Sequence, residues 1–168
     1  MAILTIVVSI TAPALANFFR GRSLDSEARR LLSLTREGQS RAVSEGIPIE
    51  LWVDAQQGKV GLEAEPGYEK TDAKAVDFSV ENDIQIQVVN SGTSGGSSVF
   101  GSSGINASAS TKPVVSNHPN LPRIRFLPDG TLDESSPQMF KFTGRDGISL
   151  WVAQSRGRLS YEIRNHGS

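Results

Sequence analysis

The 168-residue sequence predicts an α+β protein, in which a long N-terminal helix with an apolar first half packs on an antiparallel β-sheet head. Three observations predict this class. No charged residue precedes Arg20, and apolar residues then recur at helical spacing as far as Gly46. From Ile47 onward the pattern changes to the alternation that is typical of half-buried strands. We expect the helix to span about residues 2–45 and the head about residues 47–166.

Residues 1–22 form the apolar half of the predicted helix. The uncharged run from Met1 to Phe19 approaches the roughly 20 residues that cross a hydrocarbon core. Pro13 removes one backbone hydrogen bond, so we expect a bend there. We expect this segment to lie in a membrane and in the core of a filament, through Ile3, Leu4, Ile6, Val7, Val8, Ile10, Pro13, Leu15, Phe18 and Phe19.

A cleaved secretory signal peptide is the alternative for this segment. Ala14-Leu15-Ala16 resembles the small-residue site at which signal peptides are cleaved. Signal peptides also carry a positively charged region before the apolar run, and no Lys or Arg precedes this one. The missing charge favours a helix that continues into the head.

Residues 23–45 are predicted to continue the helix in amphipathic form. Ser23 and Asp25 can cap a fresh start, so one kinked helix and two abutting helices are both open at this stage. Gly46, followed by Pro48, marks the end of the helix. The apolar face predicted to pack on the head carries Leu24, Ala28, Leu31 and Leu32, and the other faces carry Arg29, Arg30, Arg36, Glu37 and Arg41.

Residues 46–168 form the predicted head, with a long loop inside it. Residues 90–111 are rich in Gly, Ser and Ala and have little bulk to bury, so we expect a mobile loop with no role in the core. Alternating patterns and turn residues predict strands at 47–53, 59–64, 76–80, 84–89, 123–127, 138–143, 148–153 and 158–163.

The composition argues against several chemistries. Lys and Arg number 17 against 18 Asp and Glu, so no attraction of the whole molecule to polyanions follows, although segment 47–90 is acidic and 91–168 basic. The absence of cysteine excludes disulfides, thiolate catalysis and cysteine-based zinc sites. The sequence contains no nucleophile, phosphate-binding or dinucleotide motif. We therefore expect no enzymatic activity, cofactor or metal.

Few single residues suggest a site. His118 and His166 lie in a loop and a tail without an evident acidic partner, so we expect them to face solvent. Residues 129–134 contain three acidic side chains, but they lack the spacing of an EF-hand, and a tight turn is favoured over a calcium site. Trp52 and Trp151 lie on predicted strands, where packing is the default role and an outward contact surface the alternative.

The last predicted hairpin has a basic edge formed by Arg156, Arg158 and Arg164. These arginines can contact phosphates or an acidic partner subunit. They can also simply keep an edge strand from pairing promiscuously, which is the favoured interpretation, because three arginines make a small electrostatic footprint.

In their order along the chain, these features resemble the type IV pilin-like proteins, and in particular the GspH/FimT family. The segment from Ala28 to Leu51 resembles the family's helix end, which runs through A-R-x-E-A-x-x-R-G-x-P-V into the first strand. Phe126-Leu127-Pro128-Asp129-Gly130 matches its F-x-P-D-G turn, and Gly157-Arg158 resembles the G-R of its last hairpin.

The resemblance implies a minor pseudopilin, which is a structural subunit of a type II secretion pseudopilus or type IV pilus-like fibre that supports protein export. It further implies a single-pass helix in the bacterial inner membrane, a periplasmic head, methylation, and other pseudopilins as partners through the N-terminal helix. The family's basic leader and Phe-x-x-x-Glu segment have no counterpart in this sequence, so we expect the sequence to start several residues late.

Two other functions are kept as alternatives. DNA-binding FimT-like proteins carry G-R-x-R near the C-terminus, and here Ser160 stands in place of the second arginine. A pilus-associated DNA-uptake factor is therefore less favoured, with nucleic acid as its partner. A secreted β-domain with a cleaved signal peptide is the other alternative.

Overall fold

The computed structural model describes residues 2–68, 72–89 and 117–165, with side chains from residue 22 onward to residue 164. The predicted Gly/Ser loop at 90–111 and His166 lie outside the described residues. The α+β class is confirmed, because one helix precedes a set of strands in the described chain. These elements are α1 (Ala2–Glu45), β1 (Ile49–Asp54), β2 (Lys59–Ala64), β3 (Val76–Ser79), β4 (Ile84–Val89), β5 (Arg123–Phe126), β6 (Met139–Gly144), β7 (Ser149–Gln154) and β8 (Tyr161–Asn165).

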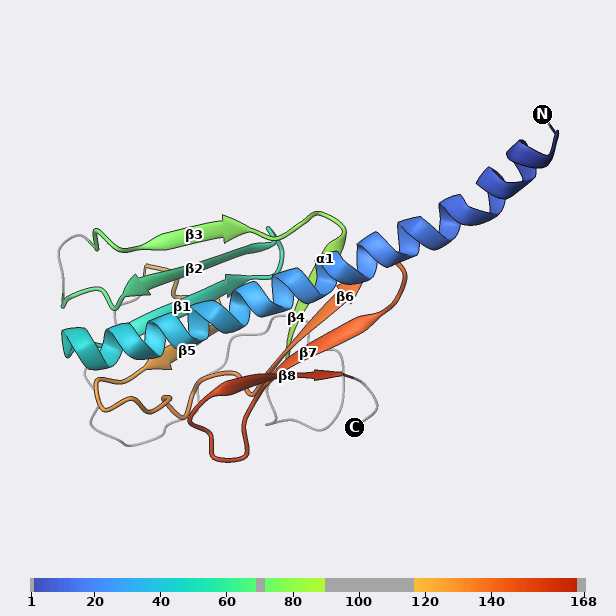
Figure 1. Ribbon diagram of the computed structural model, residues 1–168. Coiled ribbons are helices and arrows are strands. Elements are labelled where there is room, and N and C mark those ends of the chain that lie inside the picture. Colours follow the sequence, from blue (N-terminus) through green and yellow to red (C-terminus); the bar gives the residue numbers. More distant parts are fainter. Residues whose placement is uncertain (1, 69–71, 90–116, 166–168) are drawn as a thin grey trace.

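The head contains two antiparallel sheets, each of four strands among the described residues. The first has the order β3-β2-β1-β5 and the second the order β4-β6-β7-β8. The chain therefore leaves the first sheet after β3 and returns to it once, with β5. Figure 1 shows α1 running across the head, with its N-terminal part projecting beyond it. The C-terminal part of the helix contacts strands of both sheets.

The predicted apolar face of the helix packs on the head. Leu24, Ala28 and Leu31 are buried, and Leu32 is half-buried against the same core. Gly38 lies between them and the end of the helix, and it lets the helix approach the first sheet closely. A Cβ atom at this position would lie 2.6 Å from the Phe126 ring.

The helix is a single element from Ala2 to Glu45. It continues through Ser23 and Asp25, so the alternative of two abutting helices is wrong. The bend expected at Pro13 stays a prediction. Gly46 ends the helix as expected, because it adopts a φ of 69°, and its N–H donates to the Ala42 carbonyl at 3.1 Å.

β1 follows the predicted alternation, except that Glu50 on its other face is also fully buried. In β1 the inward residues Ile49, Leu51 and Val53 are completely buried. The strand predicted at 158–163 is present but starts later than expected, because β8 begins at Tyr161. Arg158 has a φ of 54°, which extended backbone does not adopt, and its N–H closes a turn onto the Ser155 carbonyl at 2.9 Å.

Candidate interaction surfaces

The projecting half of α1 is the first candidate surface. Its backbone is helical from Ala2, and its side chains lie outside the described residues, so the ten apolar positions named above stay a prediction. Within the described part of the chain, no helix has the length and hydropathy of a membrane span.

The basic edge of the last hairpin is the second candidate surface, and its three arginines do not lie together. Arg156 and Arg158 are exposed in the turn between β7 and β8, and no ion pair involves either of them within the described residues. Arg164 lies on β8, where its Nε is 2.8 Å from Glu162 Oε1. Two of the three positive charges are thus uncompensated, and the third is paired.

Trp151 occupies the outward face of the second sheet. Its neighbours across the strands are Lys141 on β6 and Arg164 on β8. The Lys141 Nζ lies 5.2 Å from the centroid of the indole ring, within the range of a cation–π contact. Trp151 is half-buried, so its outward position matches the contact-surface alternative for this residue.

Trp52 holds the corresponding outward position on the first sheet. Its ring covers Gly61, where a Cβ atom would lie 2.3 Å from the ring. His118 packs on the same ring, with the centroids 4.2 Å apart, and its Nε2 is 3.8 Å from Glu63 Oε1. His118 therefore has an acidic neighbour that was not expected, because the fold brings β2 close to a distant loop, while its side chain is still 33 % exposed.

The acidic segment after β5, residues 129–134, forms the turn that the sequence favoured over a calcium site. Gly130 has a φ of 83°, and Thr131 donates its N–H to Asp129 Oδ1 at 2.9 Å. Asp133 is 3.3 Å from Arg125 Nη1, and the same guanidinium reaches Glu65 at 2.8 Å. The turn is thus anchored to β5. No group of three acidic, His or Cys side chains that could hold a metal occurs in the described part of the chain.

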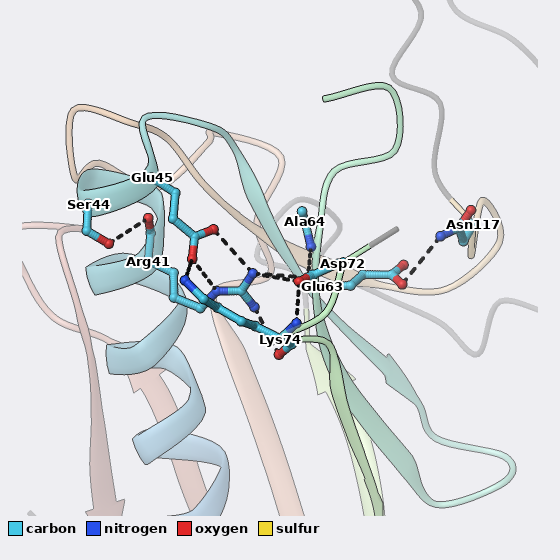
Figure 2. A network of polar contacts seen from close by, with 8 residues as sticks. All are labelled: Arg41, Ser44, Glu45, Glu63, Ala64, Asp72, Lys74 and Asn117. Atoms are coloured by element: carbon cyan, nitrogen blue, oxygen red, sulfur yellow. Dashed lines mark hydrogen bonds and ion pairs between the residues drawn. The ribbon is translucent and has the colours of Figure 1, made fainter. Parts of the chain in front are cut away.

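A polar network at the C-terminal end of α1 is a feature that the sequence did not reveal (Figure 2). Arg41 was expected on a solvent-facing side of the helix, but its side chain is only 8 % exposed. Its guanidinium lies 3.0 Å from Asp72 and 3.2 Å from Glu45. Asp72 also accepts the N–H groups of Ala64 at 2.7 Å and Lys74 at 2.8 Å. We call these five residues the Arg41 network.

The Arg41 network favours the ionised carboxylates. Burial by itself raises the pKa of Asp72, but the two backbone N–H groups and Arg41 outweigh burial and hold the pKa below its usual value. Hydrogen bonds from Arg41 and then Lys74 lower the pKa of Glu45. The network ties the chain between β2 and β3 to the helix, so we assign it a structural role.

Comparisons with known proteins place the fold. No protein-family model matches the chain, and no curated protein sequence matches it. Among solved structures, the chain is similar to the minor pseudopilin EpsH from the type II secretion system of Vibrio cholerae. One structure gives a TM-score of 0.53 at 10% identity, covering 88% of this chain and 96% of that chain. A second gives 0.49 at 11% identity, covering 89% and 98%. The first of these likenesses confirms the fold that the sequence resemblance implied.

Proposed function

We propose that this chain is a minor pseudopilin, a structural and non-enzymatic subunit of a type II secretion pseudopilus or type IV pilus-like fibre. The observation that carries the proposal is the geometry of α1. One continuous helix buries its second half on the head, while its first half projects away with nothing of the described head beside it. A helix that is apolar where it projects needs another apolar environment.

The proposed environment is the bacterial inner membrane before assembly and neighbouring pilin-like helices afterwards, with the head in the periplasm. Burial of apolar side chains drives both, at roughly 25 cal/mol per Å² removed from water. The likeness to EpsH supports the pseudopilin role through the shared fold. The division into a membrane and filament segment at 1–22, an amphipathic segment at 23–45 and a head at 46–168 belongs to this proposal, as does methylation.

Fractionation tests the anchoring part of the proposal. We expect the full-length chain to sediment with membranes and to need detergent for release, while a version beginning at Ser23 is soluble and folded. Circular dichroism of the shortened version is the folding control. Equal recovery of both proteins in detergent-free buffer would contradict the proposal. Deletion of the chain in its own bacterium, with loss of export or of fibres, tests the assembly part.

DNA uptake is the second candidate function. Arg156 and Arg158 favour it, because both are exposed and unpaired within the described residues. Contact with so few phosphates gives weak binding. The logarithm of the association constant falls linearly with the logarithm of the salt concentration, with a slope of about −0.9 per phosphate contact. Titration of the protein with short duplex DNA at two salt concentrations separates the candidates. Sub-micromolar affinity that an Arg156→Ala/Arg158→Ala/Arg164→Ala variant loses would place DNA uptake first.

A further inference from the structure

The part of α1 that packs on the head carries two regular rows of residues on opposite faces. The buried row is spaced alternately by four and three residues, and it contains Leu24, Ala28, Leu31, Thr35, Gly38 and Ala42. A second row starts two residues earlier with the same spacing, and all its residues are exposed: Arg22, Ser26, Arg29, Ser33, Arg36, Ser40 and Val43. Each residue of an α-helix turns by about 100°, so this offset places the second row opposite the head. We call the second row the Arg/Ser seam.

The charged residues of the Arg/Ser seam are all of one sign. Arg29 pairs with Asp25 at 2.7 Å, and no ion pair involves Arg22 or Arg36 in the described part of the chain. The exposed Glu37 beside the seam forms no ion pair with it there either. The three arginines follow one another at intervals of seven residues, which is about 10 Å along the helix axis. The seam is therefore a line of positive charge about 20 Å long, with only short serine side chains between the arginines.

The spacing of the Arg/Ser seam is the spacing through which one helix packs along another. Positions three and four residues apart form the contact row of paired helices, and short side chains let two helix axes approach closely. In Figure 1, α1 lies in front of both sheets and no labelled element covers it. Phe19 and Leu15 occupy the next two positions at the same spacing in the sequence. A helix that packs along the apolar half of α1 would therefore meet the Arg/Ser seam as it continues.

Other occupants fit the Arg/Ser seam less well. A second copy in the same orientation would place arginine against arginine, which repels. Lipid head groups are too distant, because Arg36 lies 17 residues beyond Phe19. This is about 25 Å along the axis, whereas the head groups occupy about 5–8 Å on each side of the hydrocarbon core. Nucleic acid would gain at most three phosphate contacts, which gives weak binding, and it does not need the spacing of a helix contact.

We propose that the Arg/Ser seam binds the helix of a different single-pass subunit, one that carries Asp or Glu at seven-residue intervals along the face it presents. Both helices are anchored in the same membrane with their heads on the same side, so they run parallel. The proposal rests on the filament role, and it adds the face of α1 that is used and the charge of the partner. It suits a minor subunit, because the contact requires a partner of different sequence.

Two synthetic peptides test this contact on the full-length chain in phosphatidylcholine vesicles. Each peptide has a Leu/Ala membrane segment of about 20 residues, followed by an alanine-rich helix of about 28 residues. One peptide carries Glu at every seventh position of that helix, and the other carries Gln at the same positions. Energy transfer from the dye-labelled chain to the labelled peptide reports binding. We expect about eightfold higher affinity for the Glu peptide, because each of three exposed ion pairs contributes about a factor of two.

A charge-removing variant and a matched control make the test specific. Arg22→Ser/Arg36→Ser should reduce the preference for the Glu peptide from about eightfold to about twofold, because one seam arginine remains. The control is Lys59→Ser/Arg145→Ser, which removes two exposed cations outside α1 and should leave the preference at about eightfold. All four side chains are exposed, so thermal unfolding should show that both variants fold like the natural protein.

Several results would overturn the contact. Equal affinity for the Glu and Gln peptides does so, and so does an equal loss of preference in the seam variant and the control. Displacement of the Glu peptide by equimolar short duplex DNA, or by phosphatidylglycerol added to the vesicles, would assign the seam to phosphates instead. Energy transfer between two labelled copies of the chain that the seam variant loses would assign it to a second copy.

Export in the deletion strain separates this contact from the filament role. We expect the wild-type chain and the Lys59→Ser/Arg145→Ser control to restore export, and Arg22→Ser/Arg36→Ser to restore less of it. If the seam variant restores export fully, the contact is overturned while the filament role stands. If deletion of the chain affects neither export nor fibres, the filament role itself fails.

Discussion

Replacing Arg41 with methionine is expected to cost about 3 kcal/mol of unfolding free energy, because it leaves a carboxylate without its partner in a mostly buried site. The Arg41 side chain is 8 % exposed and that of Asp72 is 9 % exposed. Methionine keeps most of the apolar stem, so the change removes charge and hydrogen bonds with little loss of packing.

The magnitude follows from what remains after the substitution. Asp72 loses the guanidinium at 3.0 Å but keeps the N–H groups of Ala64 and Lys74. Glu45 keeps the Lys74 ammonium at 2.7 Å. Breaking a buried ion pair costs about 3–5 kcal/mol, and these retained partners place the loss at the lower end. For a chain of this size, the loss corresponds to a fall in Tm of about 6–12 °C.

Urea and thermal unfolding, followed by circular dichroism on the full-length chain in mild detergent, measure the loss. The matched control is Arg36→Met, because Arg36 is an exposed arginine of the same helix with no ion pair among the described residues. This control should change stability by less than about 0.5 kcal/mol. If Arg41→Met lowers the unfolding free energy no more than Arg36→Met does, the structural role assigned to the Arg41 network is wrong.

The pH dependence provides an independent check on the same variant. Asp72 and Glu45 both have pKa values in the folded protein below their ordinary values of 3.8 and 4.5. Their stabilising contribution is therefore complete above those values and is lost as the pH falls through the lower folded pKa values. The gap in Tm between the natural protein and Arg41→Met should stay constant near neutral pH and narrow below about pH 4.

Two further predictions concern the core. Gly38→Ala gains about 1 kcal/mol of helix propensity, yet its Cβ would lie 2.6 Å from the Phe126 ring and 2.9 Å from Leu62. We expect a net loss of about 1–3 kcal/mol in urea unfolding, and a stabilised variant would contradict this close approach. Tyr161→Phe removes a buried hydroxyl that donates to the Pro137 carbonyl at 2.5 Å and accepts from Gln154 at 3.3 Å. It should cost about 1–2 kcal/mol, and burial raises the pKa of Tyr161 to about 12, so ultraviolet titration of the natural protein should show one late tyrosine that the variant lacks.

Local patterns in the sequence predicted most of the elements. The helix ends at Gly46 because glycine tolerates the positive φ of the cap. A single residue is therefore enough to predict this end. The alternation of Ile49, Leu51 and Val53 predicted both the strand and its buried face, because side chains on a strand point to opposite sides in turn. The turn at 126–130 followed from its own Pro-Asp-Gly chemistry.

The candidate surfaces were predicted less well. Arg156, Arg158 and Arg164 were grouped by their closeness in sequence, but a turn with positive φ at Arg158 separates two of them from the paired third. The contact between Ser23 of α1 and Glu81 was not predicted either, because the two residues lie 58 positions apart in the sequence.

The sequence by itself therefore determined most of the elements, the C-terminal end of the helix and the apolar buried face of strands such as β1, because each depends on residues a few positions apart. Only the tertiary structure decided that the strands divide into two sheets and that Arg41 is buried. Arg41 pairs with Asp72 across 31 positions of sequence, and Arg125 pairs with Glu65 across 60. Helical and strand periodicity describe which side a residue faces, and the burial of a charge depends instead on which distant segment covers that side.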